Sequence, residues 1–171
     1  AASYTHACTG TSEAGFTVAA GTNDVTIIGC VLSSTLTINT LASGSTVLIK
    51  GTSLPNIVFA AQSGVTINIE TTTVNSFGYG MVFNGALTNS PVSVTDCSIA
   101  NTHASVPPVD FQFAVTSSPL VFTRTSILAT GATTILTVPA GTDSVTFDGC
   151  TMARTVFINT LTPGSTILIK G

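Results

Sequence analysis

The chain contains 171 residues, and only 11 of them are Asp, Glu, Lys or Arg, whereas 32 are Thr. A soluble domain usually carries about 25% charged residues, and four basic residues against seven acidic ones leave no basic patch for a phosphate backbone, which argues against nucleic-acid binding. The apolar runs are too short for a transmembrane helix, yet Val, Ile, Leu and Phe recur throughout, so we expect a folded domain with a real core.

One eight-residue pattern recurs along the chain: apolar, any, apolar, any, small or polar, Cys or Thr, any, apolar. In chain order the copies begin at Val25, Val47, Ile67, Val92, Leu120 and Val145, and Ile167 begins another. These starting residues are 22, 20, 25, 28, 25 and 22 positions apart. The alternation of apolar residues at the first and third positions, many of them β-branched, predicts a β-strand in each copy.

Each repeat also contains a second short apolar segment that we expect to be a strand. These segments are 36–38, 57–59, 81–83, 111–113, 135–138 and 156–158. Turn residues separate the strands, and no stretch has a helical period with caps. Repeats of 20–28 residues built from strands and turns predict a β-solenoid with one coil per repeat. A β-sandwich also has short strands at close spacing, but the regular recurrence of one octapeptide favours the solenoid.

A longer repeat indicates an internal duplication. Residues 16–51 align without a gap on residues 136–171, and 21 of the 36 positions are identical. Five short repeats span this shift of 120 residues, so the two periods agree. The sequence therefore predicts one domain over 1–171, an all-β solenoid of about seven coils.

Stacking of coils explains the low charge. Equivalent residues of successive coils lie about 4.8 Å apart, so an exposed charge risks facing its like in the next coil. Thr, Ser and Asn can instead form ladders. The sixth pattern position is expected to be a small, inward-facing structural ladder at the bend, formed by Cys30, Thr52, Thr72, Cys97, Thr125 and Cys150.

Three of the four cysteines occupy this ladder. Cys97 lies three coils from Cys30 and two coils from Cys150, about 10 Å or more in each case, which is too far for a disulfide. They are therefore expected to be buried free thiols, while a Cys8–Cys30 bridge between neighbouring coils remains open. No Cys-x-x-Cys pair or Cys/His spacing suggests zinc, and no metal or cofactor is expected.

Few residues are candidates for catalysis. β-Helical enzymes that cleave polysaccharides need at least two acid–base groups within reach of one sugar. Asp96 and Arg124 are expected on adjacent coils, with Asp148 close to the same edge, and a single exposed ion pair is favoured over a catalytic pair. His6 lies near the N-terminal end, and a loop with His103 and Asp110 could bind a ligand, although a solvated loop is the simpler interpretation. No catalytic residue is assigned.

The outward strand positions bear on ice binding and on partners. Ice binding by a solenoid needs a regular array of outward Thr. Instead, the second pattern position reads Thr26, Leu48, Asn68, Ser93, Val121, Thr146 and Leu168, and the second strand presents Thr37, Val58, Val82, Gln112 and Phe157. The apolar members indicate a contact surface for another chain or a covering segment. We assign this surface to Leu48, Val58, Val82, Val121 and Phe157.

The octapeptide resembles the coils of right-handed parallel β-helix repeat proteins, which implies a right-handed winding. The segments Asn84–Ser90 and Val92–Cys97 are similar to parts of the large dispersed-gene-family surface proteins of trypanosomatids. That resemblance implies a long, extracellular, adhesin-like protein and carries over no catalytic residue.

The functional expectation is a non-enzymatic extracellular or cell-surface rod, structural or adhesive. The chain begins with Ala and stops halfway through a coil without a visible cap, so we expect a mature or partial chain that belongs to a longer array or stacks as a filament. Its partners would be copies of itself or further repeats, with glycans as a further candidate, and no membrane insertion is expected within it. The alternatives are a carbohydrate-binding or carbohydrate-cleaving β-helix and, second, an ice-binding protein.

Overall fold

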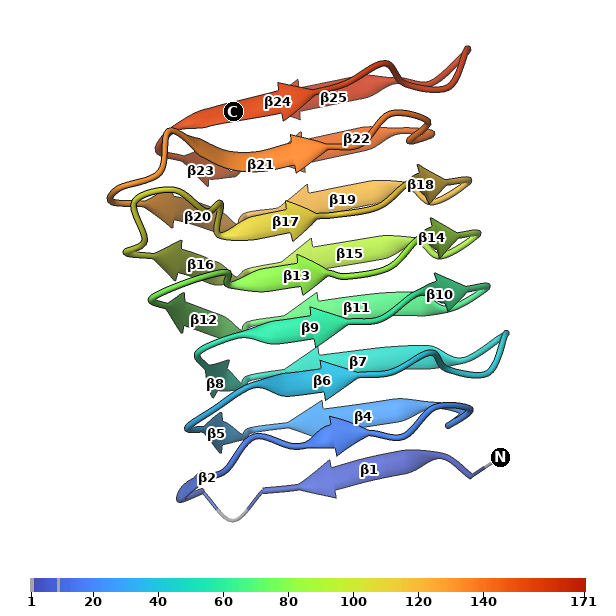
Figure 1. Cartoon of the computed structure of the whole chain (residues 1–171), viewed down its shortest axis with the longest axis vertical. Coiled ribbons are helices and arrows are strands. Elements are labelled where there is room, and N and C mark those ends of the chain that lie inside the picture. Colours follow the sequence, from blue (N-terminus) through green and yellow to red (C-terminus); the bar gives the residue numbers. More distant parts are fainter. Residues whose placement is uncertain (1, 9) are drawn as a thin grey trace.

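The chain winds upward as a stack of β-strand coils (Figure 1). The computed structural model describes residues 2–8 and 10–171, and within them it contains 25 strands and no helix. In Figure 1 the front strands run to the right and the rear strands to the left as the chain rises from its N-terminus, so the winding is right-handed. The predicted solenoid of about seven coils is confirmed.

The first strand of each copy of the octapeptide belongs to one eight-stranded parallel sheet. In order, its strands are β1 (Tyr4–Ala7), β4 (Val25–Ile28), β7 (Thr46–Lys50), β11 (Thr66–Glu70), β15 (Val92–Thr95), β19 (Leu120–Thr123), β22 (Val145–Asp148) and β25 (Ile167–Lys170). The first pattern positions are direct partners, as in Val25 with Val47 and Val145 with Ile167. The repeat read from the sequence is therefore the register of the sheet.

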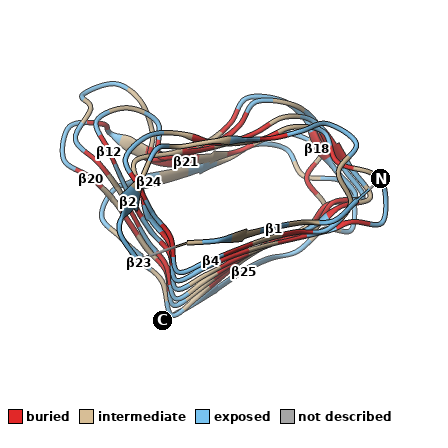
Figure 2. Ribbon diagram, turned by 90° about the horizontal axis from the view of Figure 1, so that it is seen from below, coloured by how far each residue is buried: buried red, intermediate tan, exposed pale blue. Residues whose placement is uncertain are grey.

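The last positions of the octapeptide form a second parallel sheet beyond the bend. Its strands are β2 (Ser12–Glu13), β5 (Val31–Leu32), β8 (Ser53–Leu54), β12 (Thr73–Ser76), β16 (Ser98–Asn101), β20 (Ser126–Ala129) and β23 (Thr151–Met152). A short three-stranded sheet comprises β10 (Gln62–Ser63), β14 (Leu87–Thr88) and β18 (Val115–Thr116). In the view along the stack, these two sheets lie at opposite sides of the cross-section of each coil (Figure 2).

The remaining seven-stranded sheet contains the second apolar strand of each repeat. Its members are β3 (Thr17–Val18), β6 (Leu36–Ile38), β9 (Ile57–Phe59), β13 (Met81–Phe83), β17 (Val109–Phe111), β21 (Thr134–Val138) and β24 (Thr155–Ile158). The strand expected at 111–113 was placed two residues too late. Because a shift of two residues preserves the inward–outward alternation, periodicity alone could not distinguish Val109–Phe111 from 111–113. The outward residue of this coil is therefore Asp110, the partner of Val82, and not Gln112.

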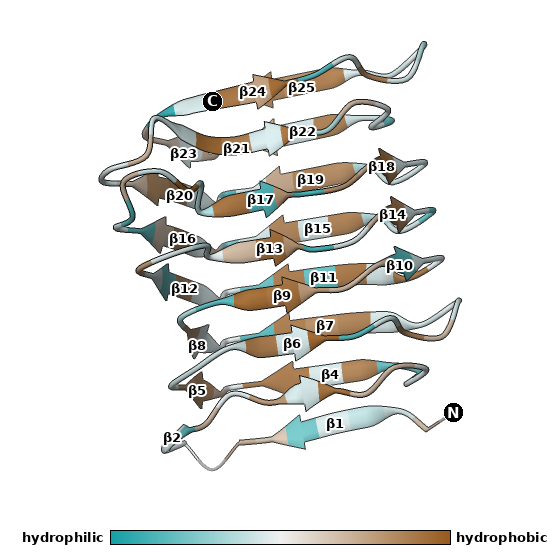
Figure 3. Cartoon of the chain, viewed as in Figure 1, coloured by the Kyte–Doolittle hydropathy of each residue, from teal (hydrophilic) through white to brown (hydrophobic). Residues whose placement is uncertain are grey.

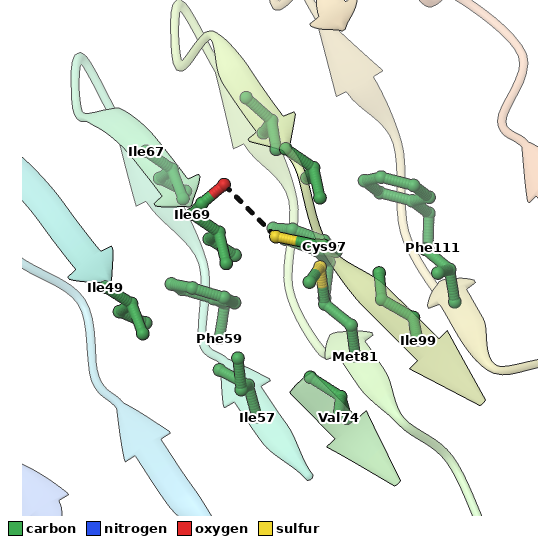
Figure 4. Packing of buried hydrophobic residues seen from close by; sticks show 14 of the residues in the cluster. Ile49, Ile57, Phe59, Ile67, Ile69, Val74, Met81, Cys97, Ile99 and Phe111 are labelled. Atoms are coloured by element: carbon green, nitrogen blue, oxygen red, sulfur yellow. Dashed lines mark hydrogen bonds between the residues drawn. The ribbon is translucent and has the colours of Figure 1, made fainter. Parts of the chain in front are cut away.

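Inward side chains fill the space between the sheets with stacked apolar rows. Hydrophobic residues, coloured brown in Figure 3, accordingly recur from coil to coil. Phe83 lies between Phe59 and Phe111, with ring centroids 4.9 and 4.5 Å apart and nearly parallel ring planes. Figure 4 shows Phe59 and Phe111 in this core together with Cys97, whose Sγ lies 3.5 Å from the carbonyl oxygen of Ile69. Ladders of like side chains, one per coil, thus build the core.

A left-handed backbone residue turns the chain at the bend after the first strand. The fifth pattern position has a positive φ in six successive coils, at Gly29, Gly51, Thr71, Asp96, Arg124 and Gly149. The conformation is therefore demanded by the bend and not by the residue type, since L-residues other than Gly adopt it only at a cost. This bend places the sixth-position side chain inward and the fourth- and fifth-position side chains outward.

Candidate functional sites on the solenoid

The sixth-position ladder lies at this bend and satisfies backbone groups. Cys30, Thr52, Thr72, Cys97 and Thr125 are buried, and Cys150, near the C-terminal end, is half-buried. The hydroxyl of Thr72 donates to the carbonyl oxygen of Glu70 at 2.9 Å, and that of Thr125 accepts from the backbone N–H of Cys97 at 3.3 Å. The hydroxyl groups of the ladder thus bond to the protein's own backbone and serve a structural role.

The cysteines fall into two groups. Cys8 and Cys30 form a disulfide between neighbouring coils, with their Cα atoms 5.1 Å apart. The expectation of a free thiol is therefore wrong for Cys30, because parallel pairing of β1 with β4 brings Cys8 beside the bend. Cys97 and Cys150 are free thiols. Burial raises the pKa of Cys97 to about 11, so this thiol is chemically quiet at neutral pH.

The outer side of the bend carries six of the eleven charged residues of the chain, which we call the charged corner: Lys50, Glu70, Asp96, Arg124, Asp148 and Lys170. They are paired across adjacent coils, each cation with a carboxylate. Arg124 donates two hydrogen bonds to Asp96, at 2.6 and 2.7 Å, which confirms the expected neighbours. The Nζ atom of Lys50 lies 3.0 Å from Oε2 of Glu70, and the Nζ atom of Lys170 lies 3.6 Å from Oδ2 of Asp148. Opposite charges therefore occupy the positions where like charges would repel.

Pairing determines the chemistry that the corner can perform. The bidentate hydrogen bonds from Arg124 lower the pKa of Asp96, although the carboxyl group is exposed. A general acid for glycoside cleavage needs the opposite shift, a raised pKa that keeps its proton near neutral pH. Asp96 is therefore suited to an ion pair and unsuited to proton donation.

A polar cluster occupies the first coil in place of the apolar core. Tyr4, His6 and Glu13 hold the inward positions that Val25, Ile27 and Leu32 fill in the next coil. The imidazole of His6 lies 3.1 Å from the Tyr4 hydroxyl through Nδ1 and 2.9 Å from a Glu13 carboxylate oxygen through Nε2. Phe16 stacks on the His6 ring, with centroids 4.2 Å apart. Figure 3 shows the pale and teal β1 beneath the brown β4.

This cluster forms a polar cover over the N-terminal end of the core. Burial, and to a lesser degree the nearby Glu13 carboxylate, raises the pKa of Tyr4. Sequence reasoning found no partner for His6, since Glu13 is seven residues away and belongs to another sheet. The available signal was the replacement of apolar residues by polar ones at inward positions of the first coil.

The loops near His103 form a separate feature. The side-chain amide of Asn101 is buried and donates to the carbonyl oxygens of Gly78 and Val106, at 3.1 and 2.7 Å, while its Oδ1 has no partner among the described residues. This amide ties two loops together. Phe77 is 80% exposed and meets the ring of His103 edge-on, with centroids 5.9 Å apart.

Asp110 takes part in a separate interaction, since its carboxylate accepts a hydrogen bond from Gln112 at 3.0 Å. Its place on the outer face of β17, beside Val82, is fixed by the sheet. His103, which was grouped with it in the sequence, has Phe77 and the backbone N–H of Ser105 as its contacts. The two residues of the predicted loop are thus engaged with different neighbours.

The predicted contact surface is only partly open. Leu48, Val58 and Val121 are half-buried, and Phe157 is 58% exposed, but Val82 is 5% exposed. Val82 pairs with Val58 on one side and Asp110 on the other. Apart from Phe77 and Phe113, the large apolar side chains with the greatest exposure include Phe157, Ile167 and Ile169, which lie toward the C-terminal end.

In comparisons with known proteins, no family model, curated protein or solved structure matches this chain. None of the described residues forms a helix that is long and apolar enough to cross a membrane.

Proposed function

We propose that this chain acts as a non-enzymatic, extracellular structural or adhesive rod. The observation that carries the proposal is the continuity of the stack: one parallel sheet runs through eight strands, from β1 to β25, without a change of direction. Successive coils are joined by backbone hydrogen bonds and by the sixth-position ladder. Such a structure resists bending and presents its outer rows at a fixed spacing of about 4.8 Å.

The charges support a scaffold in preference to an enzyme. Glu70, Asp96 and Asp148 each have a cation within 4.0 Å on the adjacent coil, and Asp96 is held ionised by Arg124. Cleavage of a sugar needs two carboxyl groups with divergent pKa values that face one substrate. In the charged corner, each of these carboxylates instead forms an ion pair with a Lys or Arg side chain of the adjacent coil.

The disulfide supports an extracellular location. Cys8–Cys30 joins the first two coils, and such bonds persist in oxidising compartments. The similarity of Asn84–Ser90 and Val92–Cys97 to the trypanosomatid surface proteins leads to the same proposal. Partners would be copies of the chain or further repeats, which would meet the apolar side chains near the C-terminal end.

Electron microscopy of the purified protein, together with an assay for polysaccharide cleavage, tests this proposal. We expect rods or end-to-end assemblies and no release of reducing ends. The matched variant is the triple substitution D96N, D110N and D148N, which should leave both results unchanged. Discrete monomers would contradict assembly, and release of sugar that the triple variant abolishes would contradict the non-enzymatic role.

Carbohydrate binding is a second candidate, and the loop of Phe77 favours it. An 80% exposed Phe beside the edge of His103 is an aromatic platform of the kind on which sugar rings stack, and Asn101 holds both loops in place. A glycan array with the natural chain and with F77A tests this candidate. Retained signal with F77A would remove this loop as the binding surface. The outward rows of Thr are interrupted by Leu48, Val58 and Val121, which gives ice binding no comparable support.

A further inference from the structure

We propose that reduction of the Cys8–Cys30 disulfide converts the first coil into a binding site for one Zn²⁺ ion, with His6, Cys8 and Cys30 as protein ligands. The donor atoms of these three residues lie within 4.8 Å of one another. They form the one such three-residue group found in residues 2–8 and 10–171. The proposal does not depend on the role of the rod.

Strand pairing brings the ligands together from two coils. His6 and Cys8 are two positions apart on the first coil, so their side chains leave the same face of the chain. Cys30 lies at the bend after β4, and β4 pairs directly with β1. A metal here would link the same two coils that the disulfide links, which is why a change of redox state need not separate them.

The ligand set suits zinc. Thiolate and imidazole are the common ligands of Zn²⁺, at about 2.3 and 2.0–2.1 Å. A tetrahedral arrangement at these bond lengths needs ligand atoms roughly 3.5–4 Å apart. The two sulfur atoms, which are bonded to each other in the oxidised chain, must therefore move apart after reduction, while the imidazole needs to approach by at most about 1 Å. Three protein ligands would leave a fourth position for water or for Glu13, whose carboxylate lies 2.9 Å from the His6 ring.

Neighbouring groups already orient the imidazole. Tyr4 contacts Nδ1 and Glu13 contacts Nε2, at 3.1 and 2.9 Å, and Phe16 covers the ring. Whichever nitrogen turns to the metal, the other keeps one of these hydrogen bonds. Outer hydrogen bonds of this kind fix the ring and strengthen metal binding by about 10–100-fold.

The conversion balances with a thiol reductant. Two equivalents of a monothiol reduce the Cys8–Cys30 bond, giving two protein thiols and one molecule of the reductant's disulfide. Binding of Zn²⁺ then converts the two thiols to thiolates and releases two protons. Oxidation reverses the sequence, because sulfur atoms joined in a disulfide are not available as thiolate ligands.

The test uses the whole chain, fully reduced by a phosphine and handled without oxygen, and Co²⁺ as a spectroscopic probe. We expect one equivalent of Co²⁺ to give thiolate-to-metal charge-transfer and tetrahedral d–d bands, and Zn²⁺ to displace it. The oxidised chain should show neither band. H6A should weaken Zn²⁺ binding at least about 100-fold, and E13Q by about 10-fold.

Matched variants separate this site from the other thiols and from loss of folding. The double variant C97S and C150S should bind the metal as the natural chain does, since neither residue belongs to the cluster. The double variant C8S and C30S should lose the charge-transfer band while circular dichroism still shows a β-solenoid. Unchanged bands in C8S and C30S, equal Zn²⁺ affinity in H6A, or no binding by the reduced chain would each overturn the proposal.

Discussion

Thr125 shows how one hydroxyl group serves several backbone groups at a buried bend. Its Oγ1 accepts a hydrogen bond from the N–H of Cys97 at 3.3 Å and lies 3.0 and 3.1 Å from the carbonyl oxygens of Thr123 and Val94. The residue is 1% exposed, so water cannot replace these contacts. A buried N–H without a partner costs free energy comparable to a lost hydrogen bond.

We therefore expect T125V, which keeps the shape and removes the hydroxyl, to lower the free energy of unfolding by about 1–3 kcal/mol. T125S keeps the hydroxyl and loses one methyl group, and should be affected less. Urea denaturation of the three proteins measures the effect. If T125V were as stable as the natural chain, the hydrogen bond to Cys97 would have no energetic role.

The Asp96–Arg124 pair makes a prediction about pH. Because Arg124 lowers the pKa of Asp96, we expect R124Q to raise that pKa toward the ordinary value of 3.8. The pair stabilises the fold fully above this ordinary value, and its contribution is lost as the pH falls through the lower pKa of the folded state. Both side chains are exposed, so the effect on overall stability is small.

Nuclear magnetic resonance titration of the Asp96 carboxyl carbon measures this change directly. R154Q is the matched control, because it removes one positive charge at an exposed residue outside the charged corner. An Asp96 pKa that moved equally in both variants would assign the shift to net charge and not to the pair.

Residues inside the repeat could be placed from the sequence, and residues outside it could not. Asp96 and Arg124 share one pattern position in successive coils, so their contact followed from stacking. Tyr4, His6 and Glu13 belong to a first coil that lacks the octapeptide, and only the pairing of β1 with β4 brings them to inward positions. The Cys8–Cys30 bond was left open for the same reason.

At the scale of elements, the turns decide whether strands stack. Gly44 has a φ of 87° just before β7, and a Cβ atom built on it would meet nothing within 4 Å. Its backbone N–H donates to the carbonyl oxygen of Gly64 in the next coil at 2.7 Å. The conformation of the backbone, and not a lack of space, therefore requires glycine here.

We expect G44A to lower the free energy of unfolding by about 1 kcal/mol, because an L-residue is strained in this region. G78A is the matched control, since Gly78 has no positive φ and also has open space at its Cβ. Thermal or urea denaturation compares the two. Equal stability of both variants would show that the turn before β7 relaxes without cost.

Strand positions were predictable to the extent that alternation and spacing agree. The inward rows of the first strands follow from β-branched alternation and were correct. The strand at Val109–Phe111 was misplaced because Phe111-Gln-Phe113 repeats the same alternation two residues later, and only pairing with Met81 resolves the register. The two-residue strands β5 and β8 are too short to show a period of their own.

At the scale of the molecule, residues 120 positions apart occupy equivalent places in the stack. β4 and β22 each have a neighbouring strand on both sides in the same sheet. β7 also has two neighbours, whereas its counterpart β25 has one. Val47 and Ile49 are buried, whereas their counterparts Ile167 and Ile169 are 49% and 63% exposed. The difference is the coil that covers β7 and not a difference in sequence.

We therefore expect that appending a copy of residues 52–88 after Gly171 adds a coil and a half in register. Amide exchange in β25 should slow by at least about 10-fold, because its outer edge gains hydrogen-bond partners. Hydrogen-exchange mass spectrometry measures the change, with a scrambled version of the same 37 residues as the control. Equal exchange in both proteins would contradict the equivalence of the two repeats.

The Cys8–Cys30 bond also gives the molecule a mechanical polarity. Under tension between the two ends of the chain, this bond carries the load past the first coil, and the chain between the two sulfur atoms cannot lengthen. The two cysteines are 22 residues apart in the sequence, and without the bond this segment could extend by roughly 75 Å. Cys97 and Cys150 form no such bond, so the coils near β25 are free to unravel one after another. A pulled molecule should yield from its C-terminal end, with its first coil the last to be lost.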